Sequence, residues 1–127
     1  MPHPQQISAT DTGLLVIDVQ EKLLPFIPGH KPLVRNIKFM LDAARTLNMT
    51  VQATEQYPRG LGPTISELAA MLPNRPDKTA FSSCGVPSVV ENFHLAATPK
   101  IVLTGIETHV CVLNTALDLL ALDFRVY

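Results

Sequence analysis

Cysteine is scarce in this sequence, and neither sign of charge is in large excess. Two cysteines among 127 residues cannot form a disulfide framework. Ten basic and eleven acidic side chains leave a net charge of −1, which gives no electrostatic basis for binding nucleic acid or an anionic membrane. No apolar run reaches the length of a transmembrane helix. These absences predict a soluble protein of a reducing compartment, which we expect to be the cytoplasm.

Several motifs are missing as well. Gly60 and Gly62 do not lie in a strand–GxGxxG–helix unit, and no Walker-type phosphate loop is present, so we expect no nucleotide cofactor. Residues 1–12 are polar and contain no apolar segment of the kind found in signal peptides, which predicts a flexible N-terminal tail.

The rest of the chain alternates between apolar strands and amphipathic helices. Residues 13–20 and 100–106 are continuous apolar runs, typical of parallel strands buried on both faces, and residues 49–56 indicate a further strand. Helical spacing of apolar residues recurs in residues 33–47, 86–95 and 110–122, with a short helix opening at Pro63 or Thr64. This alternation predicts a single α/β domain over residues 1–127. We expect three layers, α/β/α, with a mainly parallel, Rossmann-like open sheet as the middle layer.

The segments between these elements are rich in proline and glycine. Residues 21–32 and 57–64 are predicted to be loops, and residues 79–84 suggest a short strand. The last four residues, FRVY (124–127), open a strand at which the chain stops. We expect either that the final strand and helix of the domain are missing or that a partner completes this edge of the sheet.

Cys111 lies where a strand gives way to a helix. Gly105 closes the apolar strand, and helical periodicity starts near Val110, which predicts that Cys111 lies in the first helical turn. There, unpaired N–H groups and the positive end of the helix dipole favour a thiolate and offer donors to an oxyanion. The alternative interpretation is a small buried cysteine that only packs.

Two further residues could complete a site with Cys111. Asp18 follows the first apolar strand, and parallel strands present their carboxyl ends at one edge of the sheet, so Asp18 and Cys111 should face the same crevice. A partly desolvated carboxylate is a usable proton acceptor, and Lys78 would supply the positive charge that a neighbouring thiolate and carboxylate need. Taken alone, Asp18 could equally cap a loop and Lys78 could lie on the surface.

Three segments in this order, LLVIDVQ, DKTAFS and LTGIETHVCVLNTALDL, resemble the isochorismatase-like cysteine hydrolase family, which includes nicotinamidases. The likeness extends over residues 13–127. It implies a catalytic triad of Asp18, Lys78 and Cys111, and a cis peptide bond between Ile106 and Glu107. It also implies an oxyanion hole formed by the backbone N–H groups of Glu107 and Cys111. The reaction implied is hydrolysis of an amide-type carbon–nitrogen bond through a thioester, in a protein that forms homo-oligomers.

The sequence departs from two branches of this family. Members that act on isochorismate lack the cysteine, so Cys111 argues against that substrate. Metal-containing nicotinamidases place an aspartate and two histidines after the second strand, where this chain reads ATEQYPRGLG, so we expect no catalytic metal. The histidines are too scattered to form a ligand cluster by spacing; they are His3, His30, His94 and His109.

The substrate is expected to be a small molecule held by side chains around the strand ends. The candidate pocket residues are Gln20, Leu23, Phe26, Tyr57 and His109. Two other functions stay open at this point: a non-catalytic, oligomeric binding or scaffold protein of the same fold, and a protein that responds to oxidation through Cys84 and Cys111. Otherwise Cys84 is interpreted as a structural or loop cysteine.

Overall fold

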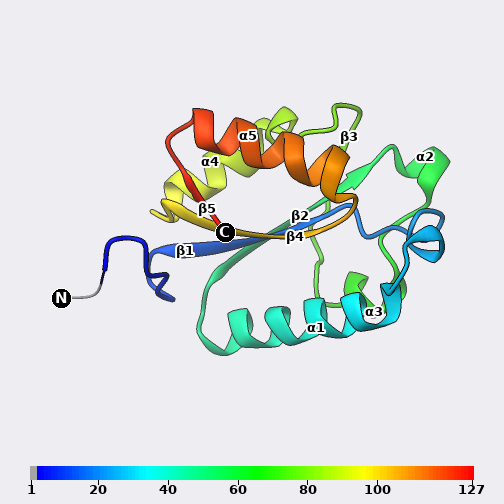
Figure 1. Cartoon of the computed structure of the whole chain (residues 1–127), viewed down its shortest axis with the longest axis horizontal. Helices are drawn as coiled ribbons and strands as arrows, with labels where there is room; N and C mark the ends of the chain where they lie inside the picture. Colours follow the sequence, from blue (N-terminus) through cyan, green and yellow to red (C-terminus); the bar gives the residue numbers. More distant parts are fainter. Residues whose placement is uncertain (1–2) are drawn as a thin grey trace.

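A computed structural model describes residues 3–127 as a five-stranded parallel sheet covered by helices on both faces (Figure 1). The strand order is β3-β2-β1-β4-β5. The strands are β1 (Thr12–Ile17), β2 (Thr50–Gln56), β3 (Asp77–Lys78), β4 (Lys100–Gly105) and β5 (Arg125–Val126). The helices are α1 (His30–Thr46), α2 (Pro58–Leu61), α3 (Ser66–Ala69), α4 (Pro87–Leu95) and α5 (Leu113–Ala121). Short turns of 3-10 helix cover Leu24–Phe26 (η1) and Ser83–Gly85 (η2), and a π-helical turn, η3, covers Thr108–Val112.

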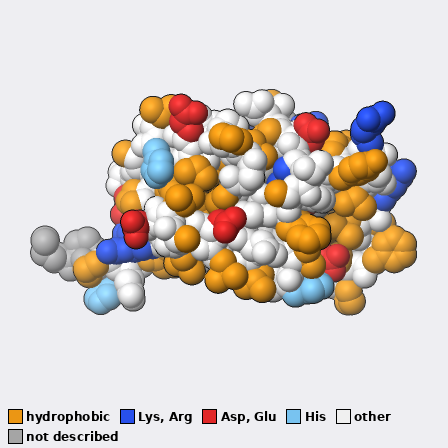
Figure 2. All heavy atoms as spheres, turned by 90° about the horizontal axis from the view of Figure 1, so that it is seen from above, with side chains coloured by type: hydrophobic (Ala, Val, Ile, Leu, Met, Phe, Trp, Pro, Cys, Tyr) orange, Lys and Arg blue, Asp and Glu red, His pale blue; other side chains and the backbone are white. Residues whose placement is uncertain are grey.

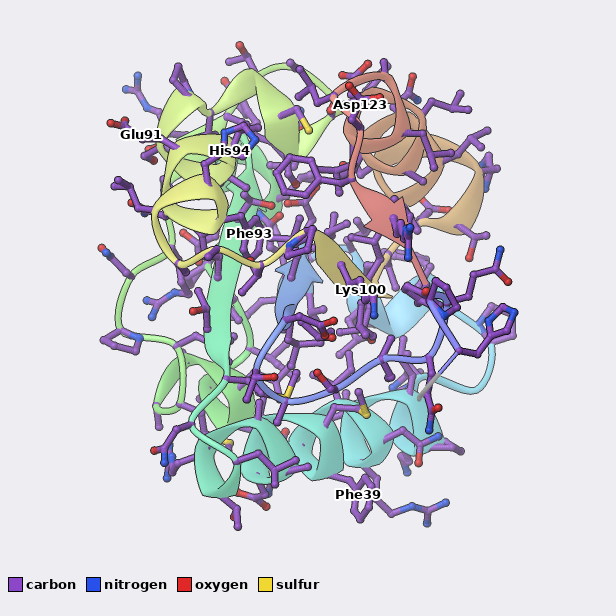
Figure 3. The ribbon with its side chains drawn as sticks, turned by 90° about the vertical axis from the view of Figure 1, so that its left-hand side faces the viewer. Phe39, Glu91, Phe93, His94, Lys100 and Asp123 are labelled. Atoms are coloured by element: carbon purple, nitrogen blue, oxygen red, sulfur yellow. The ribbon has the colours of Figure 1, made fainter. Side chains whose placement is uncertain are left out.

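The central strand β1 explains why the sheet is covered on both sides. Its side chains alternate: Leu14 and Val16 pack into the core under α1, whereas Leu15 and Ile17 pack into the core under α4 and α5. All four are buried, because helices lie below and above the sheet (Figure 1). Figure 3 shows Phe93 of α4 pointing inward and Phe39 of α1 pointing away from the sheet. The predicted α/β fold with a parallel sheet is thus confirmed.

The register of β1 and β4 brings their carboxyl ends together. Ile17 is paired with Gly105, so the segments that follow the two strands leave the sheet side by side. Gly105 has a φ of 129°, and a Cβ atom there would lie 2.1 Å from the carbonyl oxygen of Ile17. Only glycine therefore allows the chain to turn away from β4 at this point.

Several element boundaries differ from the predicted ones. Helix α1 begins at His30 rather than at residue 33, because Pro32 lies in the first turn, where its missing N–H has no helical partner to lose. The short strand predicted at residues 79–84 is instead Asp77–Lys78, and Ser83–Gly85 form a 3-10 turn. The helix predicted from residue 110 starts with the π-helical turn η3.

The FRVY segment does form a strand, which pairs with β4 at the sheet edge. The described part of the predicted tail, residues 3–11, contacts this side of the sheet through hydrogen bonds. Lys100 Nζ donates to the Gln6 carbonyl at 2.6 Å, and the Tyr127 hydroxyl donates to the Gln5 carbonyl. Residues 1–2 of the tail lie outside the described residues. Within residues 3–127, no helix has both the length and the apolar composition needed to cross a membrane.

Candidate functional site

A buried ion pair joins Asp18 and Lys78 at the carboxyl end of the sheet. Asp18 follows β1 and is 0% exposed, and Lys78 comes from β3, on the far side of β2. The Lys78 Nζ atom lies 2.7 Å from Oδ2 of Asp18, and the Lys78 side chain is 1% exposed. The two residues that the sequence placed in one site are therefore in direct, dry contact.

Lys78 donates to three further acceptors, which the sequence did not indicate. The side-chain Oε1 of Gln56 lies 2.7 Å from Nζ, and the carbonyl oxygens of Ala80 and Phe81 lie at 3.1 and 2.7 Å. A buried ammonium group needs an acceptor for each N–H, and these groups supply them. Lys78 is consequently fixed in position by the loop after β3 as well as by Asp18.

The second oxygen of Asp18 accepts a hydrogen bond from Thr54 in β2. The Thr54 hydroxyl donates to Oδ1 at 2.8 Å, and the backbone N–H of Asp18 donates to the Thr54 carbonyl at 3.2 Å. Asp18 has a φ of 53°, a left-handed conformation that aspartate tolerates better than most residues. Its carboxylate is thus held through both oxygens and through its own backbone.

Cys111 lies in the π-helical turn η3, is 5% exposed, and has Asp18 and Lys78 as its charged neighbours. Burial, with a smaller contribution from the Asp18 carboxylate, raises the pKa of the thiol to about 12, and Lys78 acts in the opposite direction. The thiol is therefore protonated at neutral pH. The helix-end argument from the sequence favoured a thiolate; burial and the carboxylate outweigh it here.

The backbone before Cys111 has an unusual conformation. The peptide bond between Ile106 and Glu107 is cis. The Glu107 carbonyl accepts the N–H groups of Val110 and Val112 at 3.1 and 3.2 Å, which fixes the start of η3. Among the described residues, no acceptor takes the Glu107 N–H. The role of this N–H in an oxyanion hole stays a prediction.

Gln20, a predicted pocket residue, is buried and hydrogen-bonded to backbone. Its side chain is 0% exposed. Its Nε2 donates to the carbonyls of Gln56 and Gly62, both at 2.8 Å, and its Oε1 accepts the Gln56 N–H at 2.7 Å. Because every polar atom of this amide contacts backbone, Gln20 ties the strand ends to the 57–64 loop and cannot contact a substrate without breaking these bonds.

The other four pocket candidates are not gathered into one cavity. Leu23 packs against the core under α1. Phe26 and Tyr57 are 81% and 51% exposed, and His109 is exposed as well. None of five surface hollows of about 360–640 Å³ is lined by Asp18, Lys78 or Cys111. The substrate pocket predicted at the strand ends therefore stays a prediction.

Cys84 lies in η2 and packs against the same core cluster as Cys111. It borders an open hollow of about 580 Å³ on α4, together with residues such as His94, and both cysteines are free thiols. Burial raises the pKa of Cys84 as well. Within residues 3–127, no three histidine, cysteine or carboxylate side chains come together as metal ligands.

Because the pKa of Cys111 is raised, the free energy of unfolding is expected to fall at alkaline pH. The folded protein holds the thiol proton up to about pH 12, whereas the unfolded chain releases it near its ordinary pKa of 9.0. The stabilisation is complete below pH 9 and is lost as the pH rises towards 12. Between pH 8 and about pH 10.5 we expect wild type to lose about 2 kcal/mol more unfolding free energy than Cys111→Ala. Urea unfolding at both pH values measures this; equal losses in the two proteins would contradict it.

Comparisons with known proteins identify the family. The Isochorismatase domain matches residues 12–127. Isochorismatase domain-containing protein 2A of Mus musculus is 41% identical over 115 residues, which cover 90% of this chain and 55% of that protein. Isochorismatase domain-containing protein 2 of Danio rerio is 38% identical over 123 residues, which cover 96% of this chain and 62% of that protein. The chain thus spans little more than half the length of these curated relatives.

Solved structures agree with this result. The MAR1 ribonuclease of Caenorhabditis elegans is 40% identical, with a TM-score of 0.85 over 95% of this chain and 63% of that one. YcaC of Escherichia coli, described as an octameric hydrolase of unknown specificity, has a TM-score of 0.83 over 99% of this chain and 64% of that one. At 23% identity, YcaC shows a common fold alone. From the matched domain, the relatives and the fold, this chain belongs to the isochorismatase family.

Proposed function

We propose that this chain carries the catalytic residues of a cysteine hydrolase acting on an amide-type carbon–nitrogen bond of a small molecule. The observation that carries the proposal is the buried arrangement of a carboxylate, an ammonium and a protonated thiol: Asp18, Lys78 and Cys111. A protonated thiol needs a base before it can attack, and Asp18 is the carboxylate beside it.

The first half of the reaction forms a thioester. Asp18 takes the thiol proton as the Cys111 sulfur attacks the carbonyl carbon, and the carbonyl electron pair moves to oxygen. The backbone N–H groups of Glu107 and Cys111 bind this oxyanion, and each donor of this kind contributes about 2.7–4 kcal/mol to lowering the barrier. Asp18 then gives its proton to the nitrogen, the carbon–nitrogen bond breaks, and the amine leaves.

The second half regenerates the thiol. A water molecule gives a proton to Asp18 and attacks the thioester carbonyl, and the acid product leaves as the carbon–sulfur bond breaks. The proton held on Asp18 returns to Cys111. Lys78 stays charged throughout and offsets the negative charge that passes between Asp18 and the sulfur.

Other functions fit the observations less well. The Caenorhabditis elegans relative is called a ribonuclease in its title, but binding of RNA is favoured by an excess of basic side chains. This chain has a net charge of −1, and the face drawn in Figure 2 carries acidic as well as basic side chains. A redox switch needs Cys84 and Cys111 to pair, and both are free thiols. Self-association and a cytoplasmic location stay predictions.

The test is a search for the acyl-enzyme. The purified protein is incubated with a panel of small primary amides and N-carbamoyl compounds, while ammonia release and the intact mass are followed. We expect ammonia release and an acyl adduct on Cys111 in wild type and in Cys84→Ala, and neither in Cys111→Ala. A folded wild type that shows neither would overturn the hydrolase proposal and favour a binding role.

A further inference from the structure

A chain of buried hydroxyl groups leads away from the Asp18 carboxylate. The Thr54 hydroxyl donates to Asp18 Oδ1 at 2.8 Å and lies 2.9 Å from the hydroxyl oxygen of Ser83 in η2. Thr54 and Ser83 are 1% and 0% exposed. Neither the triad nor the oxyanion donors account for these two hydroxyl groups.

The protons in this chain can point in only one direction while Asp18 is ionised. A carboxylate only accepts, so the single Thr54 proton goes to Asp18, and Ser83 must then donate to Thr54. If Asp18 were protonated on the oxygen that faces Thr54, both hydrogen bonds would reverse direction. The Ser83 proton would then have no acceptor among the described residues. An unsatisfied buried hydroxyl is costly, so the chain favours the ionised carboxylate.

Ser83 also connects the base to the nucleophile. Its backbone N–H donates to the hydroxyl oxygen of Thr115 at 2.9 Å, and the Thr115 hydroxyl donates to the Cys111 carbonyl at 2.6 Å. Thr115 is 0% exposed and lies in α5. The η2 turn therefore stands between the residue that takes the proton and the turn that carries the thiol.

We propose that Thr54 and Ser83 are positioning residues, which keep the Asp18 carboxylate ionised and held towards Cys111. This inference rests on the proposed function, because it assigns Asp18 the role of base. Thr54 donates to Oδ1 and Lys78 donates to Oδ2, so a proton taken from Cys111 must sit on one of the carboxylate lone pairs that these two donors leave free. From such a position Asp18 can pass the proton to a leaving group.

The decisive measurement is the titration of Asp18 itself. The carboxyl carbon of Asp18 is observed by NMR in protein labelled with 13C-aspartate, and its signal is assigned by its absence in Asp18→Asn. Thr54→Val removes the donor but keeps the shape, so we expect the midpoint to rise by about 1–2 pH units. Ser83→Ala should raise it by less, and Thr54→Ser, which restores the hydroxyl, should leave it near the wild-type value.

Thr98→Val is the matched control. Thr98 is also a buried threonine, and its hydroxyl donates to the Phe93 carbonyl, away from the site. Thr98→Val should lower the melting temperature as Thr54→Val does, but should leave the midpoint of the Asp18 titration unchanged. An unmoved midpoint in both Thr54→Val and Ser83→Ala would overturn the positioning role, as would an equal rise in Thr54→Ser. Should Thr54→Val fail to fold, Ser83→Ala decides.

This titration needs no substrate, so it separates the two proposals. If the midpoint moves as expected but no amide is hydrolysed, the positioning role stands and the hydrolase proposal fails. If amides are hydrolysed and the midpoint does not move, only the positioning role fails. Where hydrolysis is found, Thr54→Val should also shift the acidic limb of its pH profile upward, a change that lost packing alone does not produce.

Discussion

Asp18→Asn is expected to lower amide hydrolysis by about 10²–10⁴-fold and yet make Cys111 react faster with iodoacetamide near neutral pH. The two effects have opposite signs because Asp18 has two influences on the thiol. As a base it is needed for attack on an amide and for protonating the leaving group. As a negative neighbour it raises the pKa of Cys111, so its neutralisation increases the thiolate that iodoacetamide consumes.

The measurement pairs two assays on the same protein. Ammonia release gives hydrolysis, and mass spectrometry of the peptide containing Cys111 gives the alkylation rate from pH 6 to 10. Cys84 in the same sample is the internal control: Asp18 is not among the groups that shift its pKa, so its rate should not change. A parallel loss of both activities would indicate a damaged fold, and slower alkylation in a folded variant would contradict this account of Asp18.

Lys78→Met is expected to destabilise the protein by about 3–5 kcal/mol, because it leaves the Asp18 carboxylate buried without its cation. Methionine retains most of the side-chain volume, so the loss reports charge rather than a cavity. Urea unfolding near neutral pH measures it. The same change should also lower the reactivity of Cys111, since Lys78 is the neighbour that favours the thiolate.

Two comparisons make this prediction specific. Arg75→Met removes a partly exposed cation that lies 3.2 Å from Glu55, and should cost only about 1 kcal/mol. The double variant Asp18→Asn with Lys78→Met should lose less than the sum of the two single changes, because it leaves no uncompensated charge. Additive losses, or a Lys78→Met loss as small as that of Arg75→Met, would show that the pair is not coupled in the folded protein.

Much of the fold followed from local patterns. The continuous apolar run over β1 indicated a strand buried on both faces, and alternating strands and helices predicted a parallel sheet. Helix starts were less predictable. Pro32 suggested a loop, but the first turn of a helix has no backbone bond for proline to break, so α1 begins before it. Around Cys111 the π-helical turn has no sequence pattern that distinguishes it from an α-helix.

The burial of several side chains around the site could not be predicted from the sequence. The end of the first predicted strand and the loop after it provided Gln20 and Phe26 as equally plausible neighbours of a substrate. In the structure Gln20 is buried against backbone, while Phe26 is 81% exposed. Gln56 and Thr54, which hold the ion pair, stand in a strand whose polar residues gave no sign of a role. Such assignments depend on what lies across the sheet, which is not a local property.

The sequence by itself determined the family, the parallel α/β architecture and the three residue types that could perform the chemistry. It did so because strand ends and motif spacing are local in the chain and because parallel strands share one carboxyl edge. Only the tertiary structure decided the protonation of Cys111 and the hydrogen bonds and ion pair that hold Asp18. Burial, the Asp18 carboxylate after β1 and the Lys78 ammonium in β3 set the affinity of the thiol for its proton, and these groups meet only when the sheet has formed.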